Sequence, residues 1–165
     1  MRRKNKILQL QLRISPEDKA AIIRHAKKAN MGISEWVLNK ALPPAEQAFG
    51  ELVLKLKSDP NPKYVLAEIH DLLNSATADE FELMVARIPQ VLLSSYLANY
   101  LAAMVEYAAA KKGKKPPRWT EEIPALTKPV FSSDLQNLRL YLLTHSPPPF
   151  RCRNIFIDSS IGERV

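Results

Sequence analysis

Residues 7–42, ILQLQLRISPEDKAAIIRHAKKANMGISEWVLNKAL, decide the fold of the N-terminal quarter of this chain. Polar and apolar residues alternate over the first eight positions, which is typical of a strand with one buried face. The apolar face consists of Leu8, Leu10, Leu12 and Ile14. The opposite face carries Gln9, Gln11 and Arg13. Because a lone strand leaves both edges unpaired and no comparable strand lies nearby, we expect it to pair antiparallel with the same strand of a second copy.

Two short helices are expected to follow this strand. Ser15 is a capping residue, Pro16 suits the first helical position, and Asp18 can bond back to the cap. Asn30 tolerates the left-handed conformation that ends helices, and Gly32 can open the second helix. Four apolar residues at helical spacing are expected to join the strand in the dimer core, namely Ile22, Ala26, Trp36 and Val37.

The net charge of the chain lies entirely in this module. The 165 residues carry 24 Lys and Arg against 17 Asp and Glu, which gives +7. Residues 1–42 hold ten of the basic residues and three of the acidic ones, so they account for the whole excess, and residues 43–165 are balanced. A basic module joined to a neutral body indicates that only one part of the chain binds a polyanion.

The strand and the start of the second helix suggest how DNA could be bound. A two-stranded ribbon fits the major groove, where Gln9 and Gln11 can bond adenine and Arg13 can bond guanine. The first turn of the second helix offers free N–H groups, and Ser34 adds a hydroxyl, which suits a phosphate. Two plainer alternatives stay open: the polar face is simply solvated, and Ser34 is an ordinary capping residue.

Residues 10–42 resemble the ribbon-helix-helix DNA-binding fold. They are most similar to the antitoxin branch with an LRISPEDKA opening, whose members repress their own promoters and neutralise an acetyltransferase toxin. The chain has Asn30 where that branch usually has Gly, and Gly32 where it often has Ser or Thr. The resemblance implies base contacts from Gln9, Gln11 and Arg13. The residues expected to contact phosphate are Arg2, Arg3, Lys4, Lys6, Gly32, Ile33 and Ser34.

The resemblance ends at about a quarter of the chain. These antitoxins usually end soon after a short toxin-binding tail, whereas here residues 43–165 follow. Apolar spacing and helix signals predict helices over 45–57, 63–74, 77–87 and 89–111. We therefore expect a mainly α chain in three parts: a ribbon-helix-helix module over 1–44, a helical domain over 45–115, and a C-terminal helix and tail over 116–165.

The last fifty residues are the expected partner-binding segment. Residues 119–130 are broken by prolines, a helix is predicted over 134–144, and the three prolines at 147–149 predict a stiff extended spacer. The run at 154–158 predicts a short strand that could pair with the sheet edge of a partner. The residues expected to bind that partner are Phe150, Arg151, Arg153, Asn154, Ile155 and Phe156. The alternative is that Phe150, Ile155 and Ile157 pack on the chain's own helices.

No motif indicates catalysis or a cofactor. The histidines at 25, 70 and 145 are far apart, there is no metal-ligand spacing or phosphate-binding glycine loop, and the lone Cys152 has no obvious base beside it. Residues 91–110 are apolar but include Asn99 and Glu106, which favours a buried helix over a membrane span. No secretory signal is evident, and a single cysteine fits the reducing cytoplasm. We expect a cytoplasmic protein that is not an enzyme and has no catalytic residues, cofactor or metal.

These observations favour a homodimeric repressor of the antitoxin type, with double-stranded DNA and a protein toxin as its partners. Two alternatives use the same residues differently. In one, the chain is a DNA-binding accessory protein of a mobile element, acting in relaxosome assembly or plasmid partition. In the other, the strand joins copies of the chain in a structural module that binds no DNA.

Overall fold

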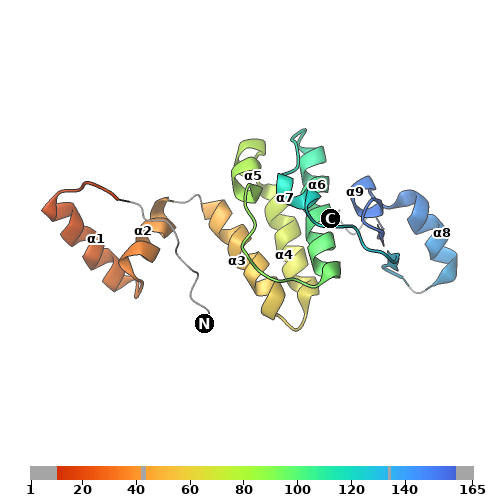
Figure 1. Cartoon of the computed structure of the whole chain (residues 1–165), viewed down its shortest axis with the longest axis horizontal. Coiled ribbons are helices and arrows are strands. Elements are labelled where there is room, and N and C mark those ends of the chain that lie inside the picture. Colours follow the sequence, from red (N-terminus) through yellow and green to blue (C-terminus); the bar gives the residue numbers. More distant parts are fainter. Residues whose placement is uncertain (1–10, 42–43, 134, 159–165) are drawn as a thin grey trace. The chain divides into compact units, whose positions relative to one another are not determined.

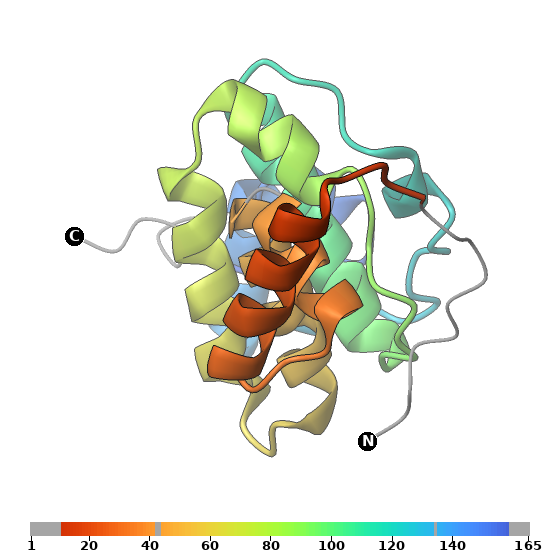
Figure 2. The same cartoon turned by 90° about the vertical axis from the view of Figure 1, so that its left-hand side faces the viewer.

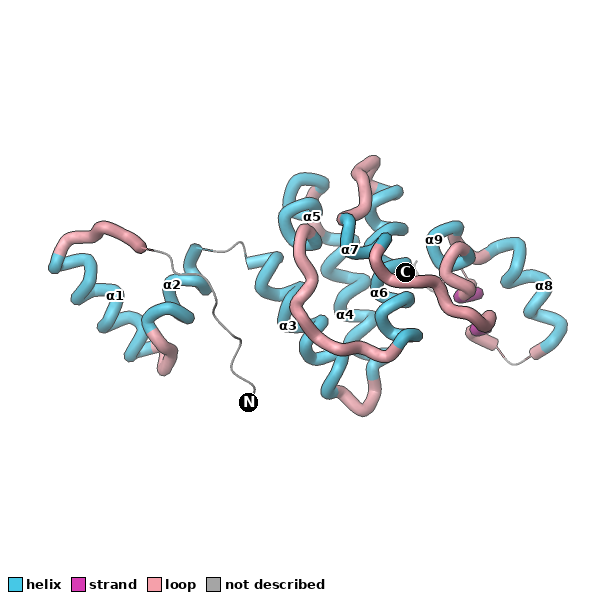
Figure 3. Tube along the Cα trace, viewed as in Figure 1, coloured by secondary structure: helices cyan, strands magenta, loops and turns pink. Residues whose placement is uncertain are grey.

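The computed structural model describes residues 11–41, 44–133 and 135–158. The chain divides into two compact units, Met1–Leu42 and Pro43–Val165. The first boundary therefore lies close to the predicted one at residue 44. The described residues are mainly helical, with two very short strands in the second unit (Figure 3). No helix among these residues is both long and apolar enough to cross a membrane.

The first unit contains α1 (Pro16–Lys28) and α2 (Ile33–Ala41), which lie side by side (Figure 2). Ser15 caps α1 by accepting a hydrogen bond from the Asp18 N–H at 3.1 Å, as its position predicts. The chain leaves α1 through Asn30, whose φ of 53° is left-handed. The N–H groups of Asn30 and Met31 bond to the carbonyls of Lys27 and Ala26, which is the Schellman arrangement.

The predicted strand is not shown in the single chain. Residues 11–15 have no regular secondary structure, and residues 7–10 lie outside the described part. A ribbon edge needs hydrogen-bonding groups from a second strand, and none pairs with residues 11–15 among the residues that the structure describes. The intermolecular ribbon therefore stays a prediction.

A group of packed helices forms the core of the second unit (Figure 1). They are α3 (Pro44–Ser58), α4 (Pro62–Ser75), α5 (Ala78–Val85) and α6 (Ser95–Lys111). Their apolar faces meet in one core, which includes Phe49, Val53, Ile69, Phe81, Leu101 and Val105. The helix predicted over 89–111 starts later than expected, because the Ser94 hydroxyl caps α6 by accepting from the Leu97 N–H.

The C-terminal third packs on this core. It contains α7 (Arg118–Glu121), β1 (Val130–Phe131), α8 (Gln136–His145), α9 (Pro148–Arg151) and β2 (Ile155–Phe156). Helices α7 and α9 contact α6, so residues 116–165 do not form the separate part that we predicted. The predicted proline spacer is wrong as well. Pro148 and Pro149 occupy the first turn of α9, where a missing N–H costs no helical hydrogen bond.

Candidate nucleic-acid interface and the C-terminal segment

The helix pair of the first unit is held by a small apolar contact. Ala26 is fully buried, and Ile22, Trp36 and Val37 are half-buried. The His25 ring stacks on Trp36, with centroids 5.7 Å apart and planes 17° from parallel. The sequence does not indicate this contact of His25, because nothing in the local pattern places it opposite a residue eleven positions later.

A large part of the apolar surface of this unit is uncovered in the single chain. Leu12 and Ile14, both predicted dimer-core residues, remain 59% and 47% exposed. Among the described residues of the unit, the other exposed large apolar side chains are Met31, Ile33 and Leu38. Leu8 and Leu10, the remaining predicted core residues, lie outside the described part. The burial of Leu12 and Ile14 in a dimer core therefore stays a prediction.

The predicted DNA contacts are accessible where they are described. Gln11 and Arg13 are exposed, as are Gly32, Ile33 and Ser34 at the start of α2. Ser34 lies within α2, and the Gly32 carbonyl accepts from the Trp36 N–H at 2.8 Å. Gly32 is thus the residue that opens the helix, and Ser34 is not its cap. The predicted contacts outside the described residues are Gln9, Arg2, Arg3, Lys4 and Lys6.

The first turns of α1 and α2 carry acidic residues, whereas their last turns carry basic ones. The first turn of α1 carries Glu17 and Asp18, whereas its last turn carries Lys27 and Lys28. Glu35 lies in the first turn of α2, where its charge would weaken a phosphate site. The helices alone are therefore a modest anion-binding surface, and the predicted strand with its basic flank supplies most of the excess positive charge.

The predicted partner-binding segment is largely folded into the second unit. Phe150, Arg153, Ile155 and Phe156 are buried, Asn154 is half-buried, and Arg151 is exposed. This is the alternative in which the apolar residues of the segment pack on the chain's own helices. Within the run at 154–158, Ile155 and Phe156 form the short strand β2, and its partner is β1 of the same chain, in parallel register with Val130 opposite Ile155.

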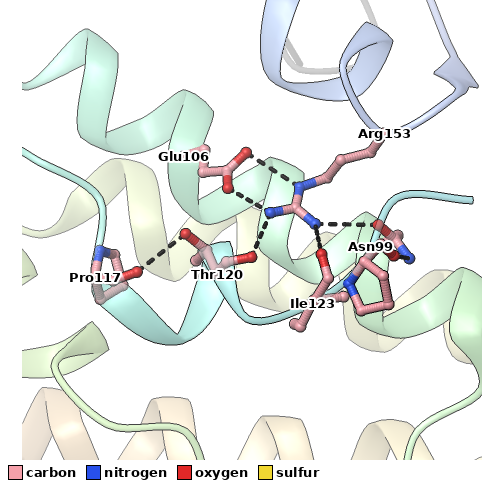
Figure 4. A network of polar contacts seen from close by, with 7 residues as sticks. Asn99, Glu106, Pro117, Thr120, Ile123 and Arg153 are labelled. Atoms are coloured by element: carbon pink, nitrogen blue, oxygen red, sulfur yellow. Dashed lines mark hydrogen bonds and ion pairs between the residues drawn. The ribbon is translucent and has the colours of Figure 1, made fainter.

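Arg153 is the centre of a buried polar network (Figure 4). Its Nε and Nη2 atoms donate to the two carboxylate oxygens of Glu106 on α6. Nη1 donates to Asn99 Oδ1 at 3.1 Å and to the Ile123 carbonyl at 3.2 Å, and Nη2 also donates to the Thr120 carbonyl at 2.6 Å. All five guanidinium N–H groups are thereby used. Arg153 joins α6, α7 and the C-terminal segment, which is a structural role.

A groove in the second unit lies between α4, α6 and the C-terminal segment. Its volume is about 560 Å³, and most of its lining is apolar. Tyr96, Tyr100 and Tyr107 of α6 line it, and burial together with the charge of Tyr96 raises the pKa of Tyr100 to about 12. The polar residues of its lining include Lys63, His70, Asp71 and Asp158. The spacing of the tyrosines along α6 could have indicated a shared face, but the opposite wall comes from distant segments.

Within the described ranges, no three His, Cys, Asp or Glu side chains come close enough together to hold a metal ion. Comparisons of this chain with protein-family models, with curated proteins and with solved structures found no match.

Proposed function

We propose that this chain is a dimeric DNA-binding repressor of the antitoxin type, which binds operator DNA through its first unit. The observation that carries the proposal is the confinement of the whole net charge of +7 to residues 1–42. A basic module attached to a neutral body can bind DNA phosphates, while the rest of the chain has no general electrostatic attraction for nucleic acid.

Dimerisation through the first strand is supported by the surface of the first unit. The exposed side chains of Leu12 and Ile14 belong to the same predicted strand face. Pairing two such strands buries that face and leaves Gln11 and Arg13 on the opposite one, directed toward a major groove. In this proposal the helix pair α1 and α2 packs against the apolar face of the paired strands.

The second unit is proposed to bind the toxin. It carries equal numbers of basic and acidic residues, so it adds no general attraction for DNA. Because the segment 150–156 is mostly buried in the fold, the contact surface for a toxin would be the folded unit and not a free tail.

The test is the affinity of the purified full chain for the DNA upstream of its own gene, compared with a scrambled duplex of the same length. We expect binding to the upstream duplex that is tighter by at least about 1000-fold, the lower end for specific DNA-binding proteins, with a steep dependence on salt. Equal affinity for the two duplexes would remove operator recognition. Absence of binding to either duplex at low salt would favour the structural module.

Toxin binding is tested separately by co-expression with the products of the neighbouring genes. A toxin-sized neighbour that co-purifies with the full chain and loses its toxicity supports the proposal. A mobilisation protein in that place would favour the mobile-element alternative.

A further inference from the structure

We propose that the groove between α4, α6 and the C-terminal segment binds a small aromatic carboxylate, with its ring among the groove's aromatic side chains and its carboxylate at Lys63. Small-molecule sites are typically clefts of a few hundred Å³ that are mostly apolar and have a few polar groups to orient the ligand. This groove has a volume of about 560 Å³ and both kinds of lining. The DNA-binding proposal uses none of its residues, so the two proposals are independent.

Aromatic side chains line the groove from α6, β1 and α9. The Phe150 ring meets the Tyr100 and Tyr107 rings edge-on, with centroids 5.3 and 6.4 Å apart. Lys111 already lies over the Tyr107 ring, at 4.7 Å from its centroid. Because planar rings gain from such edge-on and offset contacts beyond the area they bury, this wall favours an aromatic ligand near Tyr100. The aromatic residues of the lining are Tyr96, Tyr100, Tyr107, Phe131 and Phe150.

Helices α4 and α6 run in the same direction along the groove, and both rise from the bottom of the view in Figure 1. The Lys112 ammonium, which follows α6, donates to the carbonyls of Asn74 and Ala76 at the end of α4. The C-terminal ends of the two helices therefore meet at one end of the groove, and their N-terminal ends lie toward the other. Lys63 and Tyr96, each in the first turn of its helix, line this N-terminal end.

The N-terminal end of the groove favours an anion. The N-terminal halves of α4 and α6 contribute Lys63 and no carboxylate to the lining, and helix N-termini add partial positive charge. Lys63 is exposed and has no ion-pair partner among the described residues. Asp71 lies about 12 Å further along α4, beside His70. The other carboxylate of the lining, Asp158, already has an interaction within the chain.

Two tyrosine hydroxyls supply further donors for a carboxylate. Burial raises the pKa of Tyr96, and the pKa of Tyr100 is about 12, so both phenols are protonated at neutral pH. In the part of the chain that the structure describes, neither hydroxyl has a hydrogen-bond partner, and both are accessible. Helical side chains lean toward the helix N-terminus, which directs these hydroxyls toward the Lys63 end. A bound acid can thus keep its carboxylate near water and bury only its ring.

The test titrates the full chain with naphthalene probes whose head groups differ in charge, namely 2-naphthoate, 2-naphthamide and 2-naphthylmethylammonium. Calorimetry gives the dissociation constants. We expect 2-naphthoate to bind at least about tenfold more tightly than the amide, or about 1.4 kcal/mol, and the ammonium to bind most weakly. Lys63→Met keeps an unbranched side chain and should remove the preference for the acid. Lys57→Met, at an exposed lysine of α3 outside the groove, is the matched control and should keep it.

Methionine methyl resonances of the labelled full chain locate the probe. Met104 lines the groove, whereas Met84 lies in the core outside it. Saturation with 2-naphthoate should shift the Met104 signal and leave the Met84 signal in place, and Met104→Leu assigns the first. Tyr96→Phe keeps the ring and should weaken 2-naphthoate while leaving 2-naphthamide unchanged.

Several results would overturn the proposal. They are the absence of saturable binding of 2-naphthoate, equal affinity for the probes, tightest binding of the ammonium, and wild-type affinity for 2-naphthoate in Lys63→Met. A shift of the Met84 signal without one of Met104 would place the probe outside the groove and would also overturn it. Circular dichroism of each variant should match that of the wild type, since Lys63 and Tyr96 are exposed.

Discussion

Arg153 and Glu106 form a bidentate ion pair inside the second unit, with Nε 3.1 Å from Oε2. Their side chains retain only 8% and 18% of their exposure. The pair joins two segments that are 47 residues apart in the sequence. The guanidinium also donates hydrogen bonds to the Asn99 side-chain oxygen and to the carbonyls of Thr120 and Ile123. These acceptors therefore have a partner inside the fold in place of the water that they would bind in the unfolded chain.

Replacing Glu106 with Gln should destabilise the chain strongly. The change leaves a buried guanidinium without its counter-charge, and breaking buried pairs in this way costs about 3–5 kcal/mol. The measurement is the free energy of unfolding from urea titration. The exposed pair Lys55–Glu68 is the control, since both side chains are about half-exposed. Lys55→Ala should cost no more than about 1 kcal/mol.

The double change Arg153→Met with Glu106→Met separates the charge from the network. If only the attraction between the two charges stabilised this region, two well-packed apolar residues would give an unfolding free energy close to that of the wild type, as they do for some buried pairs. Here the change also leaves acceptors at Asn99, Thr120 and Ile123 without their donor, so we expect a substantial loss to remain. Full recovery of the wild-type unfolding free energy would show that these three bonds contribute little.

The sequence predicted the local features well and the long-range ones poorly. The cap at Ser15 and the left-handed Asn30 depend on a few neighbouring residues, so their signals are contained in short motifs. The strand around Ile155 was predicted from its composition, but its pairing with Val130 was not, because no local pattern encodes a parallel partner. Strand pairing and burial depend on which segments meet, and that information is spread over the whole chain.

The surroundings of the candidate site residues also depend on which distant segments meet, so local sequence does not predict them. Arg153 has the sequence context of an exposed basic residue. Its burial depends on Glu106, on a carbonyl of α7 and on a carbonyl of the loop that follows, and the sequence predicts no regular structure for that segment. For the predicted DNA-binding strand, the missing information lies outside the chain. Its expected partner is another chain, so neither its pairing nor the contacts of Gln11 and Arg13 can be read from one copy.

Asn30 offers a test of the helix ending in the first unit. With φ at 53°, the left-handed conformation costs a residue with a Cβ about 1–2 kcal/mol, and Asn tolerates it better than most. We expect Asn30→Ala to lower the unfolding free energy of this unit by about 1 kcal/mol, and Asn30→Gly to leave it unchanged or to raise it. Tryptophan fluorescence reports the transition, because Trp36 packs against α1 through His25. Equal stability of the two variants would contradict the left-handed ending.

The capping box at the start of α5 predicts a dependence of stability on pH. The Thr77 N–H and hydroxyl both donate to Glu80 Oε2, at 3.0 and 2.9 Å. The backbone bond is the larger cause of a pKa for Glu80 that lies below its ordinary value of 4.5, and the hydroxyl bond is the second. A carboxyl whose pKa is lowered by folding stabilises the fold above its unfolded pKa, and this stabilisation is lost as the pH falls through the folded pKa.

Glu80→Ala should therefore destabilise the chain at neutral pH, and the difference from the wild type should shrink below about pH 4.5. Thr77→Ala removes the cap itself and should cost about 1 kcal/mol at neutral pH. Unfolding free energies of the wild type and both variants, measured between pH 3 and pH 7 in steps of roughly one unit, check both expectations. A constant difference between wild type and Glu80→Ala across that range would show that the box does not act through the carboxylate.

The polar strand face should separate sequence recognition from general attraction to DNA. Arg13→Ala is expected to weaken binding to the upstream duplex by about 1–3 kcal/mol and to relax specificity, because a bidentate contact to guanine discriminates between bases. Lys4→Ala or Lys6→Ala should instead weaken binding to every duplex alike and lower the salt slope by about one. Lys57→Ala, an exposed lysine of the neutral second unit, is the control and should change neither quantity. Wild-type affinity in a chain with Gln9, Gln11 and Arg13 all replaced by alanine would exclude base recognition by this face.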